Sequence, residues 1–301
     1  MDVRPRDAAI HLGLFLACCV TTWISGALDG GVSGGLYFAM TLMGILLCHE
    51  LGHYVVGKRR GVDISLPYFI PMPPVLTLGT LGAVIQLKHE ISDRRALFDV
   101  GAAGPIAGLV VAIPLLVIGL SMSELVPIVK DTQLEGNSIL YALLKYAVFG
   151  RWLPGDGIDV QLHPMAFAGW VGLLLTMINL MPIGQLDGGH IARAAFGQAH
   201  ERLSGVLHAI LPLVGLAVGS HLYREARAEH REITEALSHA SAGIVPWLVW
   251  TLMLGWMRQR AGEYHPPVSE QPLDPRRRLY ALGMLVVFVL IATPVPFRSA
   301  L

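Results

Sequence analysis

The chain is poor in charged residues, has few cysteines and carries no excess of either charge. Asp, Glu, Lys and Arg make up 15% of its 301 residues, whereas a soluble domain has about 25%. A formal net charge of zero gives no indication of a nucleic-acid partner. Cys18, Cys19 and Cys48 lie in apolar runs, with neither metal-ligand spacing nor a plausible disulfide framework. The composition therefore argues against a soluble, a disulfide-stabilised or a nucleic-acid-binding protein.

The chain is instead rich in apolar sequence, since 53% of its residues are hydrophobic. Most of the long apolar segments approach the roughly 20 residues that cross a hydrocarbon core. We therefore expect an all-α polytopic membrane protein with about seven transmembrane helices. The segments are 8–28, 36–57, 100–120, 164–182, 203–222, 244–257 and 279–295. We expect one multi-pass domain over 1–301, with a core at about 34–222 and peripheral helices at 8–28, 244–257 and 279–295.

The distribution of Lys and Arg predicts the orientation of these segments. If the N-terminus is cytoplasmic, 15 of the 22 Lys and Arg residues fall on the cytoplasmic side, as the positive-inside rule requires. The run Lys58–Arg60 directly follows the second segment, so residues near its end should lie close to the cytoplasmic face. The lack of a plastid-type transit peptide before the first segment favours a bacterial cytoplasmic (inner) membrane.

The stretch after the second segment, PYFIPMPPVLTLGTLGAVIQLKHE, differs in character from the apolar runs. Its Gly79 and Gly82 punctuate a run of β-forming residues, as a hairpin turn or bulge requires. We expect a small membrane-associated β-hairpin over 75–88, with an irregular interfacial loop as the alternative. Further along, SILYALLKYAVFG predicts an interfacial amphipathic helix, and the alternating charges of 223–240 predict a surface helix.

Two motifs contain residues with metal-site chemistry. In HELGH, His49 and His53 are about one helical turn apart, so both imidazoles face the same way and could share one ion. Glu50 is rotated by about 100° from His49, which lets it act on a metal-bound water as a general base. Later, INLMPIGQLDGGH places Asp187 after a break at Pro182. An acid on a broken helix at membrane depth indicates a lined cavity. By itself Asp187 is at least as well explained as a helix-end or turn residue, but its pairing with HELGH favours a third metal ligand.

The two motifs together resemble those of the site-2 proteases, which are intramembrane zinc metalloproteases. HELGHY supplies the HExxH element. The N-x-x-P-x-x-x-L-D-G element is matched at Asn179, Pro182, Leu186, Asp187 and Gly188. The resemblance covers roughly residues 44–190, including PYFIPMPP, GTLGAVIQLK and AGPIAG (103–108), and it points to the bacterial and plastid branch. Residues 121–163 are too few for the PDZ domain that many members carry.

The resemblance implies one Zn²⁺ per chain, bound by His49, His53 and Asp187, with Glu50 as the catalytic base. It also implies that Asn179 lies near the substrate backbone or the oxyanion, although a hydrogen bond between helices is an equal alternative.

Other residues are expected around this centre. An edge strand is expected to pair with the unwound substrate through Leu81, Gly82, Ala83 and Val84. Gly188 and His190 are expected to support the ligand carboxylate from outside the metal's own coordination shell.

The predicted function is zinc-dependent cleavage of transmembrane segments, which makes the partners transmembrane protein substrates and the lipid bilayer. The family suggests membrane-tethered regulatory proteins as substrates. A divalent-metal transporter and a catalytically inactive family member are the alternatives, because both would retain the same intramembrane His, Glu and Asp residues.

Overall fold

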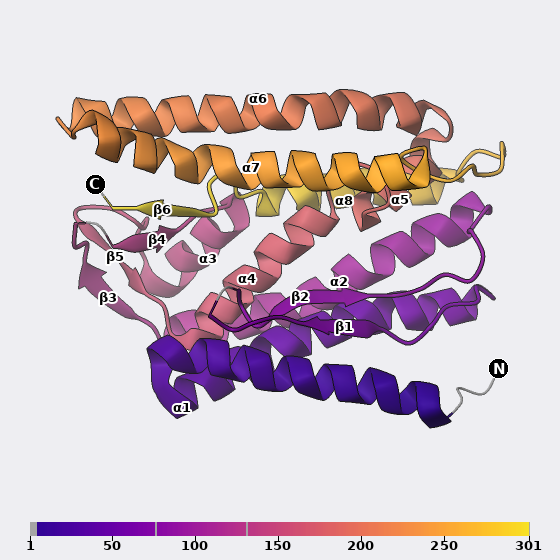
Figure 1. Cartoon of the computed structure of the whole chain (residues 1–301), viewed down its shortest axis with the longest axis horizontal. Helices are drawn as coiled ribbons and strands as arrows, with labels where there is room; N and C mark the ends of the chain where they lie inside the picture. Colours follow the sequence, from indigo (N-terminus) through magenta and orange to yellow (C-terminus); the bar gives the residue numbers. More distant parts are fainter. Residues whose placement is uncertain (1–4, 76, 131, 301) are drawn as a thin grey trace. The chain divides into compact units, whose positions relative to one another are not determined.

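The computed structural model describes residues 5–75, 77–130 and 132–300 and is mainly helical, with three two-stranded sheets (Figure 1). The chain divides into two compact units. The first consists of Met1–Glu124 and Val160–Thr176, and the second of Leu125–Asp159 and Met177–Leu301.

The first helix, α1 (Pro5–Arg59), reverses its direction at Gly31. Gly31 has φ 63°, a left-handed conformation that glycine adopts without a steric penalty. Along a straight helix Gly26 and Phe38 would be about 18 Å apart. Here a Cβ on Gly26 would come within 2.6 Å of the Phe38 Cβ, so the two halves of α1 pack against each other. The halves correspond to the predicted segments 8–28 and 36–57.

The rest of the first unit packs on α1. Helix α2 (Arg94–Ser121) begins at the N-cap Asp93 and lies along α1. Most of α4 (Pro164–Asn179) also belongs to this unit. Strands β1 (Tyr68–Pro71) and β2 (Thr80–Val84) form an antiparallel pair against α1. Thr21 Oγ1 donates to Gly79 O at 2.6 Å and fixes the β1–β2 connection to α1.

The hairpin prediction is correct in type but wrong in its first strand. We expected both strands within 75–88, whereas β1 lies earlier, at Tyr68–Pro71. Pro73 and Pro74 follow β1 and lack the backbone N–H groups that a strand needs, so they form the connection instead.

The second unit contains helices α3 and α5 to α8 and the β4–β6 sheet, together with parts of β3 and β5. Helices α6 and α7 run side by side (Figure 1) and approach closely at Gly219 and Gly243, the small-residue contact common between membrane helices. Strand β4 pairs with β6, and β3 pairs with β5. The bounds are α3 Ile139–Phe149, α5 Asp187–Phe196, α6 Ala199–Ala228, α7 Ile233–Ala261, α8 Pro275–Ile291, β3 Glu124–Pro127, β4 Gln133–Glu135, β5 Ile158–Gln161 and β6 Phe297–Ser299.

Two of the local predictions have opposite outcomes. The helix predicted in SILYALLKYAVFG is confirmed as α3, which starts at the N-cap Ser138 and ends at Gly150 in the left-handed conformation. The single surface helix predicted over 223–240 is wrong. The chain turns there at residues 229–232 between α6 and α7, and His230 has φ 61°. Charge alternation continues through this turn, so it could not indicate the break.

Four helices of the described residues are long and apolar enough to cross a membrane: α1, α2, α6 and α7. Many of their large apolar side chains are exposed, including Val110 and Leu252, which is expected of surfaces that face lipid. Helices α4 and α8 are shorter, with 16 and 17 residues. An α-helical membrane protein is therefore confirmed, while the number of seven spans stays a prediction.

Candidate metal centre

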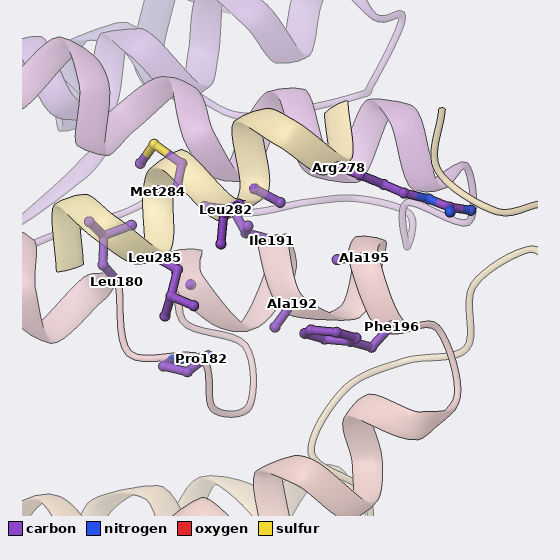
Figure 2. Close-up of a pocket in the computed structure, with 12 residues that line it drawn as sticks. Leu180, Pro182, Ile191, Ala192, Ala195, Phe196, Arg278, Leu282, Met284 and Leu285 are labelled. Atoms are coloured by element: carbon purple, nitrogen blue, oxygen red, sulfur yellow. The ribbon is translucent and has the colours of Figure 1, made fainter. Parts of the chain in front are cut away.

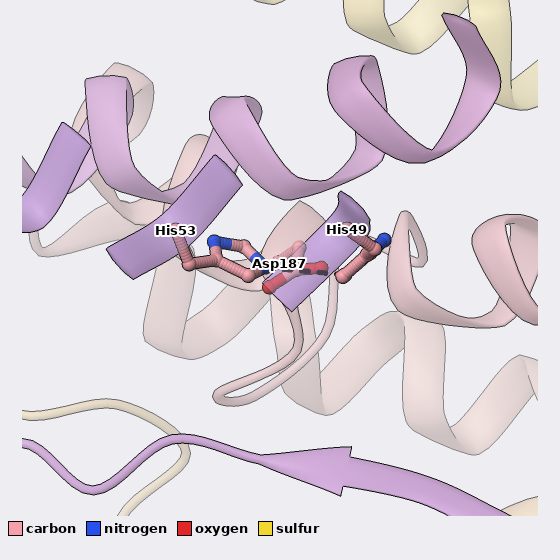
Figure 3. Close-up of side chains that lie close together, drawn as sticks. All are labelled: His49, His53 and Asp187. Atoms are coloured by element: carbon pink, nitrogen blue, oxygen red, sulfur yellow. Dashed lines mark hydrogen bonds between the residues drawn. The ribbon is translucent and has the colours of Figure 1, made fainter. Parts of the chain in front are cut away.

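The HELGH motif lies on the second half of α1, where its polar side chains are buried. His49, Glu50 and His53 are 5%, 7% and 8% exposed. The two imidazoles share one face of the helix, as their spacing predicts, and their Nε2 atoms are 3.1 Å apart (Figure 3).

The His53 ring is oriented by the start of α2. Its Nδ1 lies 2.8 Å from the backbone oxygen of Val100. A carbonyl oxygen only accepts hydrogen bonds, so Nδ1 carries the proton and donates it. In the neutral ring Nε2 then holds the lone pair, which is the tautomer that a metal ligand requires. The contact with the Val100 carbonyl therefore leaves Nε2 of His53 able to bind a metal.

The AGPIAG segment of α2 forms the surface behind both histidines. A Cβ on Gly104 would overlap the His53 ring, and a Cβ on Gly108 would lie 3.3 Å from His49 Nδ1. Gly52 on α1 likewise lies against the Ala103 backbone oxygen. These glycines let α2 approach the histidines closely, a role that the sequence analysis missed. Its signal was the spacing of Gly104 and Gly108, which equals that of His49 and His53.

The spacing of the two Nε2 atoms fits a shared ion. In tetrahedral zinc sites the Zn–N bonds are about 2.0–2.1 Å, which places two ligand nitrogens roughly 3.3 Å apart. The observed 3.1 Å is close to that value. The spacing of the two imidazole nitrogens is therefore compatible with two ligands of one zinc ion.

Asp187, the predicted third ligand, belongs to the second unit, where it is the first residue of α5 and half-buried. A Cβ on Gly188 would overlap the Leu180 backbone oxygen, and one on Gly189 would overlap that of Gly184. The two glycines thus allow the first turn of α5 to pack on the preceding loop. A carboxylate in this first turn is stabilised by the positive end of the helix dipole.

The segment that carries Asp187 is held by two other parts of the second unit. His200 of α6 places Nε2 3.3 Å from Pro182 O, and Ser204 Oγ accepts the Gly184 N–H at 3.3 Å. His190 Nδ1 lies 2.7 Å from Nε2 of His265, which is only 2% exposed in the α7–α8 connection. The supporting role of His190 stays a prediction, and the contacts of His200 and His265 were not predicted from the sequence.

The residues predicted to bind substrate lie in both units. Leu81, Gly82, Ala83 and Val84 are on β2, where Leu81 is 63% exposed and Gly82 is buried. Among the described residues β2 pairs only with β1, so its other edge has no neighbouring strand. Asn179 is the last residue of α4 and is half-buried.

An HExxH helix with converging imidazoles, in a chain of membrane-type helices, defines the class of membrane metalloproteases. The model of peptidase family M50 matches residues 37–221, which is more than half of the chain. The chain therefore belongs to that family, the site-2 proteases that its motifs resemble. The described residues between α2 and α4 form β3, β4, α3 and β5 and include no PDZ domain.

Curated relatives agree with this assignment. The chain is 37% identical to "Probable zinc metalloprotease EGY1, chloroplastic" of Arabidopsis thaliana over 56% of its length and 31% of the relative. It is 29% identical to EGY2 of the same plant over 90% of its length and 43% of the relative. It is 26% identical to EGY3 of Oryza sativa subsp. indica over 96% of its length and 45% of the relative. The chain thus spans less than half of these relatives.

Proposed function

We propose that the chain is a zinc-dependent endopeptidase that cleaves transmembrane segments of other proteins within the bilayer. The observation that carries the proposal is a buried HExxH pair with Nε2 atoms 3.1 Å apart on an apolar helix. Membership of family M50 and relatives named as probable zinc metalloproteases support it.

One Zn²⁺ would be bound by His49, His53 and Asp187, two neutral imidazoles and a carboxylate, with the fourth position open. When bound, the ion supplies a water of lowered pKa and polarises the scissile carbonyl. Approach of Asp187 to the histidines is part of the proposal, because the ligand resides in the other unit.

Glu50 acts as the proton carrier. Its carboxylate takes the proton of the attacking water and delivers it to the leaving nitrogen. Burial of Glu50 within α1 keeps bulk water from competing for that proton. Asn179 donates a hydrogen bond to the substrate backbone or to the developing oxyanion, the role that an amide side chain serves in other hydrolases.

The substrate helix must unwind before its peptide bonds can react, since its amides are hydrogen-bonded to one another. The open edge of β2 is suited to pair with the unwound segment. Replacing Ala83 with Pro, which removes a backbone donor, should abolish cleavage while zinc stays bound. Ala83→Val retains the donor and should remain active; equal cleavage by both variants contradicts the pairing.

The compartment and the substrates are also proposals. The relatives are named chloroplastic, which favours a plastid membrane over the bacterial inner membrane predicted from the sequence. The metal centre is proposed to lie near the membrane face on whose side most of the Lys and Arg residues fall. The substrates are proposed to be membrane-tethered regulatory proteins.

Glu50→Gln tests the proposed activity. In vesicles containing a transmembrane reporter, the variant should lose at least about a hundredfold in cleavage rate, because the general base is absent. Its zinc content should remain one per chain, whereas Asp187→Ala should lose zinc. Glu90→Gln, a change at an exposed acid of the same unit, is the matched control.

The same variants discriminate the rival functions. A divalent-metal transporter would retain zinc flux into vesicles without cleaving the reporter, and an inactive family member would bind the reporter with or without Glu50. Cleavage by Glu50→Gln at the wild-type rate would contradict the proposed mechanism.

A further inference from the structure

A cavity of about 420 Å³ lies between α5 and α8 in the second unit (Figure 2). Its volume is within the range of about 300–1,000 Å³ typical of ligand sites. We refer to it as the α5–α8 pocket. It is lined by Leu180, Pro182, Gly188, Ile191, Ala192, Ala195, Phe196, Arg278, Ala281, Leu282, Met284 and Leu285.

The lining has one charged side chain, and it lies at one end. Arg278 is near the start of α8, with Phe196 on the facing helix, while Leu180, Met284 and Leu285 lie at the opposite end (Figure 2). Between Arg278 and Leu285 the helix rises by roughly 10 Å. The pocket therefore has a cationic mouth and an apolar interior of elongated form.

The guanidinium of Arg278 is placed to bind an anion. Its Nε donates to Leu273 O at 2.8 Å, which fixes the base of the guanidinium. The forked Nη groups are the ones that bind a phosphate in a bidentate manner. Arg276 adds a positive charge at the same end of α8, whereas Arg277 forms an ion pair with the N-cap Asp274 at 2.7 Å.

We propose that the α5–α8 pocket binds an anionic phospholipid, with an acyl chain in the apolar interior and the phosphate on Arg278. Basic pockets between membrane helices are suited to such headgroups, and an aliphatic chain matches the lining. A substrate helix is the other occupant to consider, but an apolar helix supplies no partner for Arg278.

The lipid also touches the segment that carries the proposed third ligand. Leu180, Pro182 and Gly188 line the pocket and flank the turn that leads into Asp187. Occupancy therefore supports the conformation of that turn. This second consequence depends on the proposed protease function, whereas lipid binding does not.

The test uses the full-length chain in nanodiscs with a photoactivatable phosphatidylglycerol that carries a diazirine on one acyl chain. Labelling is performed on the Glu50→Gln variant, which is expected to lack proteolysis. The labelling therefore reports lipid binding alone, and its failure is distinct from a failure of proteolysis. The peptides of α5 and α8 should be labelled, and phosphatidylcholine with the same chain should label them about tenfold less.

Two substitutions test the site itself. Arg278→Gln removes charge-assisted hydrogen bonds, so apparent affinity for phosphatidylglycerol should fall by about tenfold or more. Ala195→Leu fills the pocket and should abolish labelling there. Val286→Phe, at an α8 side chain that is 51% exposed and outside the lining, should leave labelling unchanged.

Equal labelling by the two phospholipids, unaffected by Arg278→Gln, would show ordinary annular lipid and overturn the proposal. Labelling only by a free fatty acid probe would overturn the headgroup assignment. Displacement of the lipid by the transmembrane reporter, with labelling restored when the reporter is removed, would assign the pocket to substrate instead.

Discussion

Single residues of the α1–α2 contact hold the two histidines of HELGH in place. His53 is oriented by the Val100 carbonyl, and the two imidazoles are backed by glycines of α2. Such partners commonly account for a 10–100-fold difference in metal affinity or activity. We therefore expect α2, which packs against the histidine pair, to contribute to zinc binding without supplying a ligand.

Gly104→Ala tests this contribution. The added methyl group would overlap the His53 ring, so we expect zinc affinity and cleavage to fall by about tenfold or more. Gly44→Ala, at a helical position of α1 with open space around its Cβ, should have no such effect. Zinc titration of both proteins measures the difference, and equal affinities would contradict the backing role.

At the level of elements, the α7–α8 connection is tied to α5 through one histidine pair. Burial lowers the pKa of His265; a contact with Pro266 O opposes the shift and the charge of Arg193 adds to it, while Glu201 raises the pKa. In the folded chain His265 therefore stays neutral at neutral pH. His265 Nδ1 donates to Pro266 O, so Nε2 of the neutral ring accepts a hydrogen bond from His190 Nδ1. Two protonated rings could not keep this bond.

This arrangement predicts a pH dependence. The folded-state pKa of His265 is below its unfolded value near 6.5, so the unfolded state binds more protons at acid pH. The contribution of His265 to stability is complete above about pH 6.5 and falls as the pH drops toward its lowered pKa.

Hydrogen exchange of residues 262–274 measures this effect. Protection should decrease below about pH 6.5 in the wild type, whereas His265→Phe should show a much flatter profile. His221→Phe, at an exposed histidine of α6, is the matched control. An identical acid-induced loss of protection in wild type and His265→Phe would argue against the histidine pair as its origin.

For the whole molecule, the distribution of positive charge predicts the topology. Fifteen of the 22 Lys and Arg residues fall in segments assigned to one side. Cysteines introduced at His89 and Gln271, in a background without the three native cysteines, should react with an impermeant maleimide from that side. A cysteine at Trp152 should react from the other. Labelling of all three from one side would refute the seven-span topology.

Local rules account for the parts of the fold that the sequence predicted well. Helical geometry alone places residues four apart on one face, so the convergence of His49 and His53 followed from their spacing. Cap residues such as Ser138 and Gly150 likewise mark the ends of α3 within a few positions. The turn at 229–232 and the position of β1 were mispredicted, because charge pattern and β-propensity only weakly specify where an element ends.

The membrane class, the HExxH helix and the family motifs could be read from the order of residues alone, because each depends on composition or on neighbours within about one helical turn. Contacts of Gly104 with His53, of Val100 with His53 and of His265 with His190 could not. They join residues far apart in the chain, and long-range contacts exist only once helices pack. Packing geometry therefore decided which glycine lies against the His53 ring and which histidine contacts His190.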